Sequence, residues 1–562
     1  MPTFLETIFA QLKKAGARVV LREIHGEQFE SMTGAALLQQ VQQARAFLRN
    51  SGIQPGDRCA LLAPNSIAWV AMDLAMMAEG AIVVPLYSRQ ARGELAGMMK
   101  DCQPRLLFVS DAALGEAVAQ VWREAPPRVS VERAVGTNAS AADIFDPPIS
   151  RADADIVTII YTSGTSGEPK GVCLNVGNLN YMLGQTTERL EQLMSATGAE
   201  GPDRVFHYLP FNFAASWLLL LSCLTRETTL TLSTDLNKLA DEIRLSSPNY
   251  FLNVPTLLER VRRGVEEALA KRAAPVRGLF EKSRTAWQRI DGRHASATDR
   301  LWLWLAKKFL FSKIKKRFGR DLRALICGSA PLAPETQRFF QMLGLPVLQA
   351  YGLTETTGIC TMDDPREAAE PGYVGATIPG IEMKIDENEE IITRGPHIFP
   401  GYWNRAEETA RVQRDGWFHT GDLGERNGRG KWRIRGRIKN LIVLNSGHKV
   451  APEPLEEKIA RLVPTAQQFM IVGNGRGYLC ALIAGTAEAS AVQAALDEVN
   501  RELPHYRQIR NFKLIGNAFT AESGLLTANG KLRRDAVNVR YATEIKAMYE
   551  DRKEREVASR HA

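Results

Sequence analysis

Along the first part of the chain, continuous runs of apolar residues alternate with segments whose apolar residues recur at helical spacing. Continuous apolar stretches within 56–66, 81–87 and 154–164 have the length and the flanking turn residues of buried strands. Between the first two, residues 66–80 carry apolar side chains at helical spacing and end on Gly80. Strands that alternate with helices are typical of α/β proteins, so we predict a parallel, doubly wound sheet.

The pattern changes twice further along the chain. Residues 253–325 are mostly helix-prone and charged, and 323–332 form another apolar strand that leads into a turn of small residues. Short strands separated by Gly and Pro turns between 372 and 434 predict a β-rich subdomain. A compact α/β segment follows, and the charged residues from 542 onward predict a solvated terminal helix.

These patterns predict an α/β fold with two domains. Residues 1–436 are expected to form a large N-terminal domain of doubly wound sheets plus the β-rich subdomain. Residues 437–562 are expected to form a small α/β C-terminal domain.

Composition narrows the class of protein. Of the 562 residues, 45% are apolar and 24% charged, as in ordinary globular enzymes, and Lys plus Arg (71) exceeds Asp plus Glu (63) by eight. This mild positive balance suits anionic small molecules, and we find no basic arm or motif that indicates nucleic acid. Seven cysteines lack any CxxC pair, so we expect reduced core thiols in a cytoplasmic protein.

Two features bear on membranes. Glu6 interrupts the first apolar stretch, so we expect no signal peptide, and the longest uncharged apolar run, 214–224, is shorter than the ~20 residues of a membrane span. Residues 301–320 interleave the aromatic side chains of Trp302, Trp304, Phe309 and Phe311 with lysines. This segment fits either a helix resting on an anionic membrane or a core-packed helix with a solvated basic face.

The most informative segment is YTSGTSGEPKG, residues 161–171. Its glycines allow a close backbone approach to an anion, and Lys170 supplies a cation. A Walker A loop requires GK[ST], whereas Lys170 is followed by Gly171, so a P-loop kinase or GTPase is disfavoured. A flexible surface turn is the alternative. We predict phosphate contacts from the following residues of the loop: Thr162, Ser163, Gly164, Thr165, Ser166, Gly167 and Lys170.

This loop resembles the signature of the adenylate-forming, or AMP-binding, superfamily, which includes acyl-CoA synthetases, peptide-synthetase adenylation domains and luciferases. Four further segments match the family in its own order: GSAPL (328–332), QAYGLTETTG (349–358), WFHTGDLG with GRIKN (417–440) and LLTANGKLRR (525–534). The resemblance implies ATP, Mg²⁺ and coenzyme A as cofactors. It also implies a C-terminal domain that rotates between two half-reactions.

The resemblance assigns roles to residues of the first three segments. It places Gly328, Ser329 and Ala330 in the adenine pocket, Tyr351 against the adenine ring and Thr354 on the α-phosphate. Glu355 is implied as the Mg²⁺ ligand, with Thr162 as a second candidate. The remaining residues implied to line the nucleotide site are Gln349, Ala350 and Gly352.

The resemblance also assigns roles to residues near the start of the C-terminal domain and within it. By resemblance, Asp422 binds the ribose hydroxyls, Arg437 makes a second ribose or phosphate contact, and Lys439 lies at the hinge between the domains. Gly447 is implied to line the pantetheine tunnel during thiol transfer. Lys531 matches the family's C-terminal catalytic lysine, because the next residue, Leu532, carries no amine.

Three segments resemble bacterial long-chain fatty acyl-CoA synthetases in particular: NVPTLLERV (253–261), SGHKVAPEPLE (446–456) and AESGLLTANGKLRR (521–534). They imply a medium- to long-chain fatty acid as substrate, with Phe213 and Trp217 bordering the acyl tunnel. Many family members read LPLxH where this chain has LPFNF, so Phe213 replaces a histidine and leaves any His-dependent carboxylate contact in doubt.

Two other functions remain open at this stage. A fatty acyl-AMP ligase that loads a carrier protein shares every ATP motif and differs only in its acceptor. A non-catalytic adenylate-binding or membrane-scaffold protein is the alternative from another class, and the joint presence of Glu355, Asp422 and Lys531 argues against it. Chain length, pathway and oligomeric state do not follow from the sequence.

Overall fold

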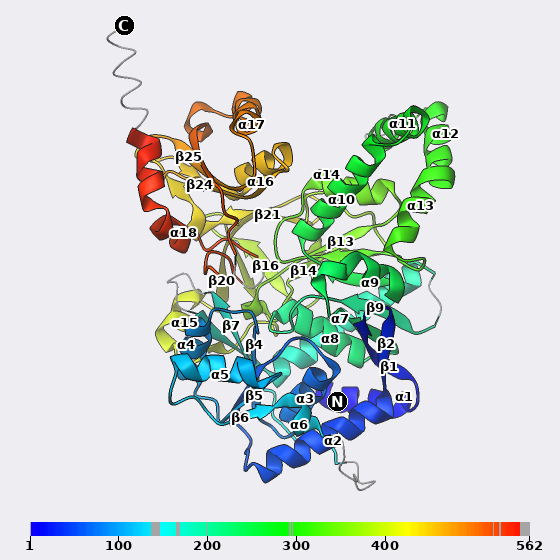
Figure 1. Cartoon of the computed structure of the whole chain (residues 1–562), viewed down its shortest axis with the longest axis vertical. Coiled ribbons are helices and arrows are strands. Elements are labelled where there is room, and N and C mark those ends of the chain that lie inside the picture. Colours follow the sequence, from blue (N-terminus) through cyan, green and yellow to red (C-terminus); the bar gives the residue numbers. More distant parts are fainter. Residues whose placement is uncertain are drawn as a thin grey trace.

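The computed structural model describes residues 2–136, 146–163, 169–198, 201–291, 294, 296–520, 522–527 and 530–550. Figure 1 shows a large body that carries the N-terminal helices and strands, and a smaller body above it on the left, near the C-terminus. The α/β prediction is confirmed, with a large N-terminal part built on sheets and a smaller C-terminal part.

The first sheet contains the strands expected from the apolar runs near the N-terminus. Its core is parallel, and the hairpin of β7 with β8 and the short β18 extend it antiparallel. Across the sheet the order is β18 (Gly401–Tyr402), β8 (Pro169–Asn175), β7 (Ile156–Ser163), β4 (Ile82–Leu86), β3 (Arg58–Leu62), β5 (Leu106–Val109) and β6 (Arg128–Ser130).

The second sheet is also mostly parallel. Antiparallel partners are β2 at one edge and β14 and β15 at the other. Across the sheet the order is β15 (Ala376–Thr377), β14 (Thr361–Met362), β13 (Val347–Tyr351), β12 (Leu325–Cys327), β11 (Tyr250–Asn253), β9 (Asp203–His207), β10 (Thr228–Leu232), β1 (Val19–His25) and β2 (Gln28–Thr33).

Helices cover both faces of these sheets, as a doubly wound fold requires. Along β3 the side chains of Cys59 and Leu61 enter one hydrophobic core, whereas Ala60 and Leu62 enter another, because successive strand residues point to opposite faces. The larger core lies between the two sheets and includes α1 (Phe4–Ala15), α2 (Gly34–Asn50), α3 (Ile67–Ala78), α6 (Val131–Val135), α7 (Val176–Ala196) and α8 (Ala214–Leu224).

The outer faces have their own helices. The first sheet is covered on its outer side by α4 (Arg92–Cys102) and α5 (Ala112–Val121). The second is covered by α9 (Leu239–Ser246), α10 (Pro255–Ala270), α11 (Ala274–Asp291), α12 (Ala297–Ala306), α13 (Ser312–Lys315) and α14 (Pro334–Met342). A π-helical turn over Lys307–Phe311 joins α12 to α13.

The predicted β-rich subdomain is an antiparallel sheet that follows the second parallel sheet. Its strands are β16 (Glu382–Ile385), β17 (Glu390–Arg394), β19 (Gln413–Arg414), β20 (Trp417–Arg426) and β21 (Trp432–Arg437), and α15 (Ala406–Val412) precedes β19.

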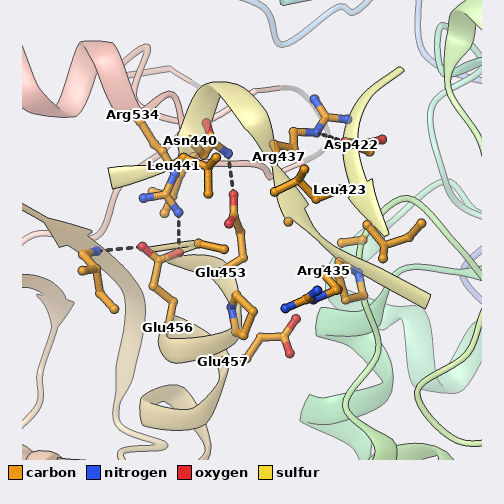
Figure 2. Close-up of a pocket in the computed structure, with 18 of the residues that line it drawn as sticks. Asp422, Leu423, Arg435, Arg437, Asn440, Leu441, Glu453, Glu456, Glu457 and Arg534 are labelled. Carbon is orange, nitrogen blue, oxygen red and sulfur yellow. Dashed lines mark hydrogen bonds and ion pairs between the residues drawn. The ribbon is translucent and has the colours of Figure 1, made fainter. Parts of the chain in front are cut away.

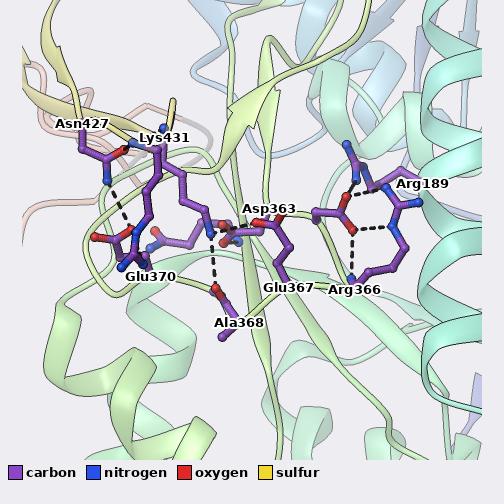
Figure 3. Close-up of polar contacts among 12 residues, drawn as sticks. Arg189, Asp363, Arg366, Glu367, Ala368, Glu370, Asn427 and Lys431 are labelled. Atoms are coloured by element: carbon purple, nitrogen blue, oxygen red, sulfur yellow. Dashed lines mark hydrogen bonds and ion pairs between the residues drawn. The ribbon is translucent and has the colours of Figure 1, made fainter. Parts of the chain in front are cut away.

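Polar contacts connect this antiparallel sheet to the end of β13 (Figure 3). The Lys431 ammonium donates to the Ala368 carbonyl at 3.2 Å, and Asn427 donates to the Glu370 carboxylate at 3.2 Å. Asp363 accepts the backbone N–H of Gln349 at 2.9 Å. These bonds fix the loop after β14 against β13, which carries residues of the predicted nucleotide site.

The small C-terminal part is a sheet with helices on both faces. A three-stranded sheet of β24 (Ala466–Val472), β25 (Leu479–Gly485) and β26 (Ile509–Ile515) packs against α16 (Glu453–Leu462) and α17 (Ala489–Arg501). The hairpin of β22 (Ile442–Val443) and β23 (Lys449–Val450) precedes it, and α18 (Arg534–Arg540) follows it. The predicted terminal helix is present over 542–550, but it is not only solvated, because Met548 and Tyr549 are buried against the sheet.

All seven cysteines are buried, and none of them forms a disulfide in the part of the chain that the structure describes. In the part of the chain that the structure describes, we find no helix that is both long enough and apolar enough to cross a bilayer.

A buried carboxyl group lies between α3 and α8. Asp73 is 1% exposed, its Oδ2 accepts the indole N–H of Trp217 at 2.9 Å, and its Oδ1 has no partner among the described residues. Burial raises the pKa of Asp73 to about 7 because the charged form loses its hydration. Asp73 therefore holds its proton in the folded protein at pH values where it would lose it in the unfolded chain.

The burial of Asp73 predicts that Asp73→Asn stabilises the folded protein by an amount that depends on pH. Between about pH 4 and pH 7 the folded state holds a proton that the unfolded state does not, so the unfolding free energy falls as pH rises, by at most about 1.4 kcal/mol per pH unit. The variant lacks this loss, so its melting temperature should exceed that of the wild type at pH 8 and not at pH 4. Glu116→Gln, at an exposed position on α5, serves as the control. An equal shift at both pH values would contradict the prediction.

Candidate active site

Two connected cavities lie at the carboxyl ends of β12 and β13, where ligands bind in open α/β sheets. The larger has a volume of about 1600 Å³ and is lined by residues of both the large and the small part of the chain. The smaller has a volume of about 590 Å³ and extends between α7 and α8. Ser329, Gly352, Arg437 and Lys531 line both, so the cavities form one continuous space.

Tight turns at the strand ends shape the inner wall. Gly328, Ser329 and Ala330 follow β12 directly and line the cavities, and Ser329 has a φ of 75°, a strained value for a residue with a side chain. After β13 the chain folds back so closely that a Cβ on Gly352 would lie 2.4 Å from the Cα of Ile359. Only glycine fits there.

Asp422 is held by two of the predicted site residues. It is 2% exposed, the Tyr351 hydroxyl donates to its Oδ2 at 2.8 Å, and Nε of Arg437 lies 2.9 Å from its Oδ1. Burial, together with the Asp422 charge, raises the pKa of Tyr351 well above its usual value, so the hydroxyl stays a donor. The Asp422 carboxylate raises the pKa of Arg437. A buried carboxylate with fixed partners can accept hydroxyl groups in a defined orientation.

Glu355 lies in a short 3₁₀ turn, Thr354–Thr356, and both Thr354 and Glu355 line the smaller cavity. The hydroxyl of Tyr402 donates to Oε1 of Glu355 at 3.0 Å. Carboxylate and phosphate oxygens together are what Mg²⁺ prefers. The residues present therefore fit a Mg²⁺ ion held by one carboxylate and by the oxygens of a bound nucleotide.

The two ends of the glycine-rich segment lie on the paired strands β7 and β8. Thr162 at the end of β7 pairs with Lys170 on β8, and both line the smaller cavity. The Lys170 ammonium forms an ion pair with Glu408 of α15 and lies 5.2 Å from the ring centroid of Tyr402. Ser163 is the last residue of β7. The other predicted residues of the loop lie outside the described part of the chain: Gly164, Thr165, Ser166 and Gly167.

The loop that carries Lys531 is anchored within the small domain. Thr527 donates its backbone N–H to the Lys531 carbonyl at 2.8 Å and accepts the Lys531 N–H on Oγ1 at 3.1 Å. Arg534 pairs with Glu456 of α16 (Figure 2), whose other oxygen accepts the Ile471 N–H at 2.7 Å. These contacts hold Lys531 at the cavity wall.

The Lys531 side chain faces a crowded set of charges. It remains open to solvent through the cavity while protein surrounds it on the other sides. This enclosure, followed by repulsion from Arg437, lowers the pKa of Lys531 to about 8, although Asp422 and Glu355 act in the opposite direction. The pKa of Lys439 is lowered for the same reasons, burial first and then Arg437. A bound polyanion would relieve this repulsion.

Three contacts hold the small domain in the orientation that places Lys531 at the cavity. They cross the boundary between the small and the large part of the chain, which we call the seam. Arg533 forms an ion pair with Glu94 of α4. Arg461 of α16 lies 2.9 Å from Glu335 of α14, and Arg263 of α10 donates to the Pro464 carbonyl at 2.9 Å. The charged side chains of this seam come from four helices and one loop that are distant in sequence.

Four other predicted residues lie in different surroundings. Lys439 lines both cavities in a 3₁₀ turn, Ile438–Asn440, between the sheet of β21 and the small domain. Gln349 lines the larger cavity, yet its side chain is buried and donates to Gln337 and to the Tyr373 carbonyl. Ala350 lines both cavities. Gly447, with a φ of 82°, lies on the exposed turn between β22 and β23 and borders neither cavity.

The smaller cavity is apolar along α8. Phe213, Ala215, Leu218 and Leu219 line it, and the role of Phe213 at an acyl tunnel stays a prediction. The prediction for Trp217 is wrong: this side chain is 2% exposed and points to the opposite side of α8, toward Asp73. Its indole N–H needs a buried acceptor, which that side of the helix provides.

Sequence patterns missed several residues that contact the site. Tyr402, Glu408 and Glu94 touch Glu355, Lys170 and Arg533 respectively, from positions far away in the chain. The segment GYWN (401–404), a glycine-led aromatic run after the antiparallel strands, is the signal that could have indicated Tyr402.

Comparisons with known proteins agree with this geometry. Two proteins similar in sequence are the long-chain-fatty-acid–CoA ligase FadD15 of Mycobacterium bovis, 27% identical with 92% of each chain covered, and long chain acyl-CoA synthetase 3 of Arabidopsis thaliana, 27% identical with 91% of this chain and 86% of that protein covered.

Solved structures share the fold. The adenylation domain of a carboxylate reductase from Mycobacterium chelonae has a TM-score of 0.76 at 23% identity, covering 98% of this chain and 91% of that one. The O-succinylbenzoate coenzyme A synthetase of Bacillus subtilis in complex with AMP has a TM-score of 0.72 at 19% identity, covering 95% and 98%.

Family profiles cover most of the sequence. The AMP-binding enzyme profile matches residues 8–403, and the profile of the AMP-binding enzyme C-terminal domain matches residues 439–553. The first match alone spans more than half of the chain and includes the phosphate loop and the Tyr351–Glu355 turn. This chain therefore belongs to the AMP-binding enzyme family.

Proposed function

We propose that this enzyme uses ATP to activate a long-chain fatty acid as an acyl-adenylate and then transfers the acyl group to coenzyme A. The observation that carries the proposal is the meeting of Lys531, Glu355 and Asp422 at one cavity that continues into an apolar space along α8. The names of the relatives, which include long-chain-fatty-acid–CoA ligases, support the same substrate class and acceptor.

In the first half-reaction, a carboxylate oxygen of the fatty acid attacks the α-phosphorus of ATP. A bond from carboxylate oxygen to phosphorus forms, the bond to the bridging oxygen breaks, and pyrophosphate leaves with its electron pair. Catalysis of such a step consists mainly of positioning and charge stabilisation. We assign Lys531 and Thr354 to the α-phosphate, Asp422 and Arg437 to the ribose, and Tyr351 to the adenine.

The departing phosphates are assigned to the turn between β7 and β8, with Thr162 and Lys170 at its two ends. Lys170 is paired with Glu408 and would have to exchange this carboxylate for phosphate oxygens. Mg²⁺ would be held by Glu355, with Thr162 as a second candidate, and would supply charge neutralisation at the phosphates. Tyr402 orients the Glu355 carboxylate through its 3.0 Å hydrogen bond.

In the second half-reaction, the coenzyme A thiol attacks the acyl carbon. A carbon–sulfur bond forms, the bond to the AMP oxygen breaks, and the thiol proton passes to solvent. Lys531 lines the cavity and Gly447 lies outside it, which suits the first half-reaction. We propose that rotation about Lys439 withdraws Lys531 and brings Gly447 inward. The open space around Gly447 leaves room for a pantetheine chain.

An acid panel with separate half-reactions tests the proposed function. We expect pyrophosphate release to be fastest with medium- to long-chain fatty acids, with a broad optimum because an apolar pocket discriminates by only about 1–3 kcal/mol per methylene. Acyl-thioester should form only when coenzyme A is added. Lys531→Ala should slow adenylation by about 10²–10³-fold and leave the conversion of pre-made acyl-adenylate close to wild type.

Two outcomes would contradict the proposal. A strict preference for acetate or for an aromatic acid would exclude the substrate class. Acyl-adenylate that accumulates equally with and without coenzyme A would indicate a ligase that loads another acceptor.

The lowered pKa of Lys531 predicts how adenylation depends on pH. The charged ammonium is required, and it is lost as pH rises through about 8. In the wild type, kcat/KM for ATP, which reports the free enzyme, should therefore fall by up to about tenfold per pH unit above this value. Lys531→Arg keeps its charge, so its profile should stay level over this range, even if its rate is lower. The same fall in both proteins would assign the titration to another group.

The ion pair between Glu94 and Arg533 predicts a selective effect on the first half-reaction. Both side chains are about four-fifths buried, and Glu94→Gln removes one charge from the seam. If this change destabilises the docked orientation of the small domain by about 1 kcal/mol, adenylation should slow roughly fivefold and thiol transfer should stay unchanged. Glu116→Gln on α5 is the matched control. A double-mutant cycle with Arg533→Gln should show that the two changes are not additive; additive losses would contradict the pairing.

A further inference from the structure

Charge is distributed unevenly along this chain. Residues 300–320 contain eight Lys or Arg and no Asp or Glu, whereas the whole chain has 71 basic and 63 acidic residues. Outside this segment there are 71 − 8 = 63 basic residues and 63 acidic ones, so the rest of the chain is balanced. The whole net charge of +8 therefore equals that of residues 300–320, which include most of α12, the π-helical turn and α13. Asp299 of α12 and Asp321 border this segment on its two sides.

The same segment exposes large apolar side chains. Leu301, Trp304 and Phe309 are 52%, 54% and 54% exposed, and among the described residues these are the one Trp and the one Phe with more than a third of their surface open to solvent. Lys308 connects the aromatic pair, with its ammonium 5.1 Å from the Trp304 centroid and 5.5 Å from that of Phe309. We call these four residues the exposed aromatic face.

Core packing does not account for this face. The inner positions Leu303, Ala306, Leu310, Phe311 and Ile314 are already buried against α11 and the second sheet. Figure 1 shows α11 and α12 side by side at the upper right, projecting away from the sheets. The exposed aromatic face lies on the other side of this hairpin, so its apolar groups are additional to those that the fold uses.

The basic groups around the face are available as well. Lys307, Lys308, Lys313 and Lys316 are exposed and form no ion pair with any described carboxylate. The nearby acids have other partners: Asp299 lies 3.4 Å from Arg289, and Asp321 lies 2.7 Å from Arg204. Lys315 differs, because it donates to the Gly344 carbonyl at 3.0 Å.

We propose that the exposed aromatic face docks reversibly on an anionic lipid leaflet. Aromatic and aliphatic side chains at the level of the headgroups, surrounded by lysines, are the chemistry of interfacial membrane binding. A second copy of the chain fits less well, since it would carry the same positive charge, and a stable dimer needs about 20–30 residues per partner. The docking requires neither ATP nor a fatty acid, so it stands independently of the proposed function.

Vesicle co-sedimentation tests the proposal without substrate. Full-length protein should partition at least tenfold more strongly onto phosphatidylcholine vesicles with 30% phosphatidylglycerol than onto pure phosphatidylcholine. Binding should weaken as salt rises from 0.05 to 0.5 M, because screening shortens the range of the charges. Lys307→Gln with Lys308→Gln should lower partition by roughly fivefold per charge at low salt. Trp304→Ser with Phe309→Ser should lower it by about tenfold or more.

Matched controls distinguish the face from general surface effects. Val121→Ser with Leu236→Ser removes apolar groups that are 47% and 42% exposed elsewhere, and Lys100→Gln with Lys238→Gln removes two exposed charges elsewhere. Both control proteins should bind vesicles like the wild type. All variants should keep the wild-type melting temperature and turnover on a soluble short-chain acid, since none of these residues lines the cavities.

A site-specific probe reports insertion directly. Because all seven native cysteines are buried, a cysteine introduced as Trp304→Cys reacts first with an environment-sensitive dye. Its emission should shift to the blue with anionic vesicles, and that of a dye on Val539→Cys, a position 81% exposed on α18, should not. Equal partition of the wild type and the Trp304/Phe309 variant would overturn the proposal. So would a dimer in sedimentation velocity that these substitutions dissociate, which would assign the face to a second copy.

Discussion

The site depends on one electrostatic interaction, the influence of the Asp422 and Glu355 carboxylates on the Lys531 ammonium across the shared cavity. Lys531 belongs to the small domain and the carboxylates belong to the large one, so the interaction exists only when the domains are docked. Enclosing an ammonium costs hydration, and Arg437 and Lys439 add repulsion that the two carboxylates offset only in part. The seam therefore needs support from outside the cavity, which the pairs Arg533–Glu94 and Arg461–Glu335 provide. A polyanion is the ligand that such an excess of positive charge lacks.

The sequence alone predicted the local motifs of the site because each motif lies at the end of a strand or in a tight turn. The apolar runs that lead to Thr162, Gly328 and Tyr351 became β7, β12 and β13, and Thr162 and the turns after β12 and β13 line the cavities. The sequence did not predict the side chains that position these residues. Tyr402 lies 47 positions from Glu355, and Arg533 lies 439 positions from Glu94, so only the folded chain brings them together.

Helix α8 shows a different limit of sequence patterns. Its eleven residues, AASWLLLLSCL, carry no charged position that would mark a solvent side, since the helix lies between two sheets. Periodicity could not tell which side faces the cavity, and Trp217 was assigned to the wrong one. The terminal helix is the opposite case, because a highly charged sequence concealed two buried residues, Met548 and Tyr549. A hydrophobic pattern identifies the buried face of a helix when the opposite face is exposed to solvent.

The π-helical turn over Lys307–Phe311 determines which way two aromatic rings point. In a regular α-helix with 3.6 residues per turn, side chains five positions apart point about 140° away from each other. A π turn closes its bonds over five residues and advances less per residue, so the azimuths of Trp304 and Phe309 converge on Lys308. If this stretch were a regular α-helix, the same two positions would point about 140° apart and the rings would separate. The geometry of a single helical turn thus determines whether the hairpin presents a coherent apolar surface or two isolated side chains.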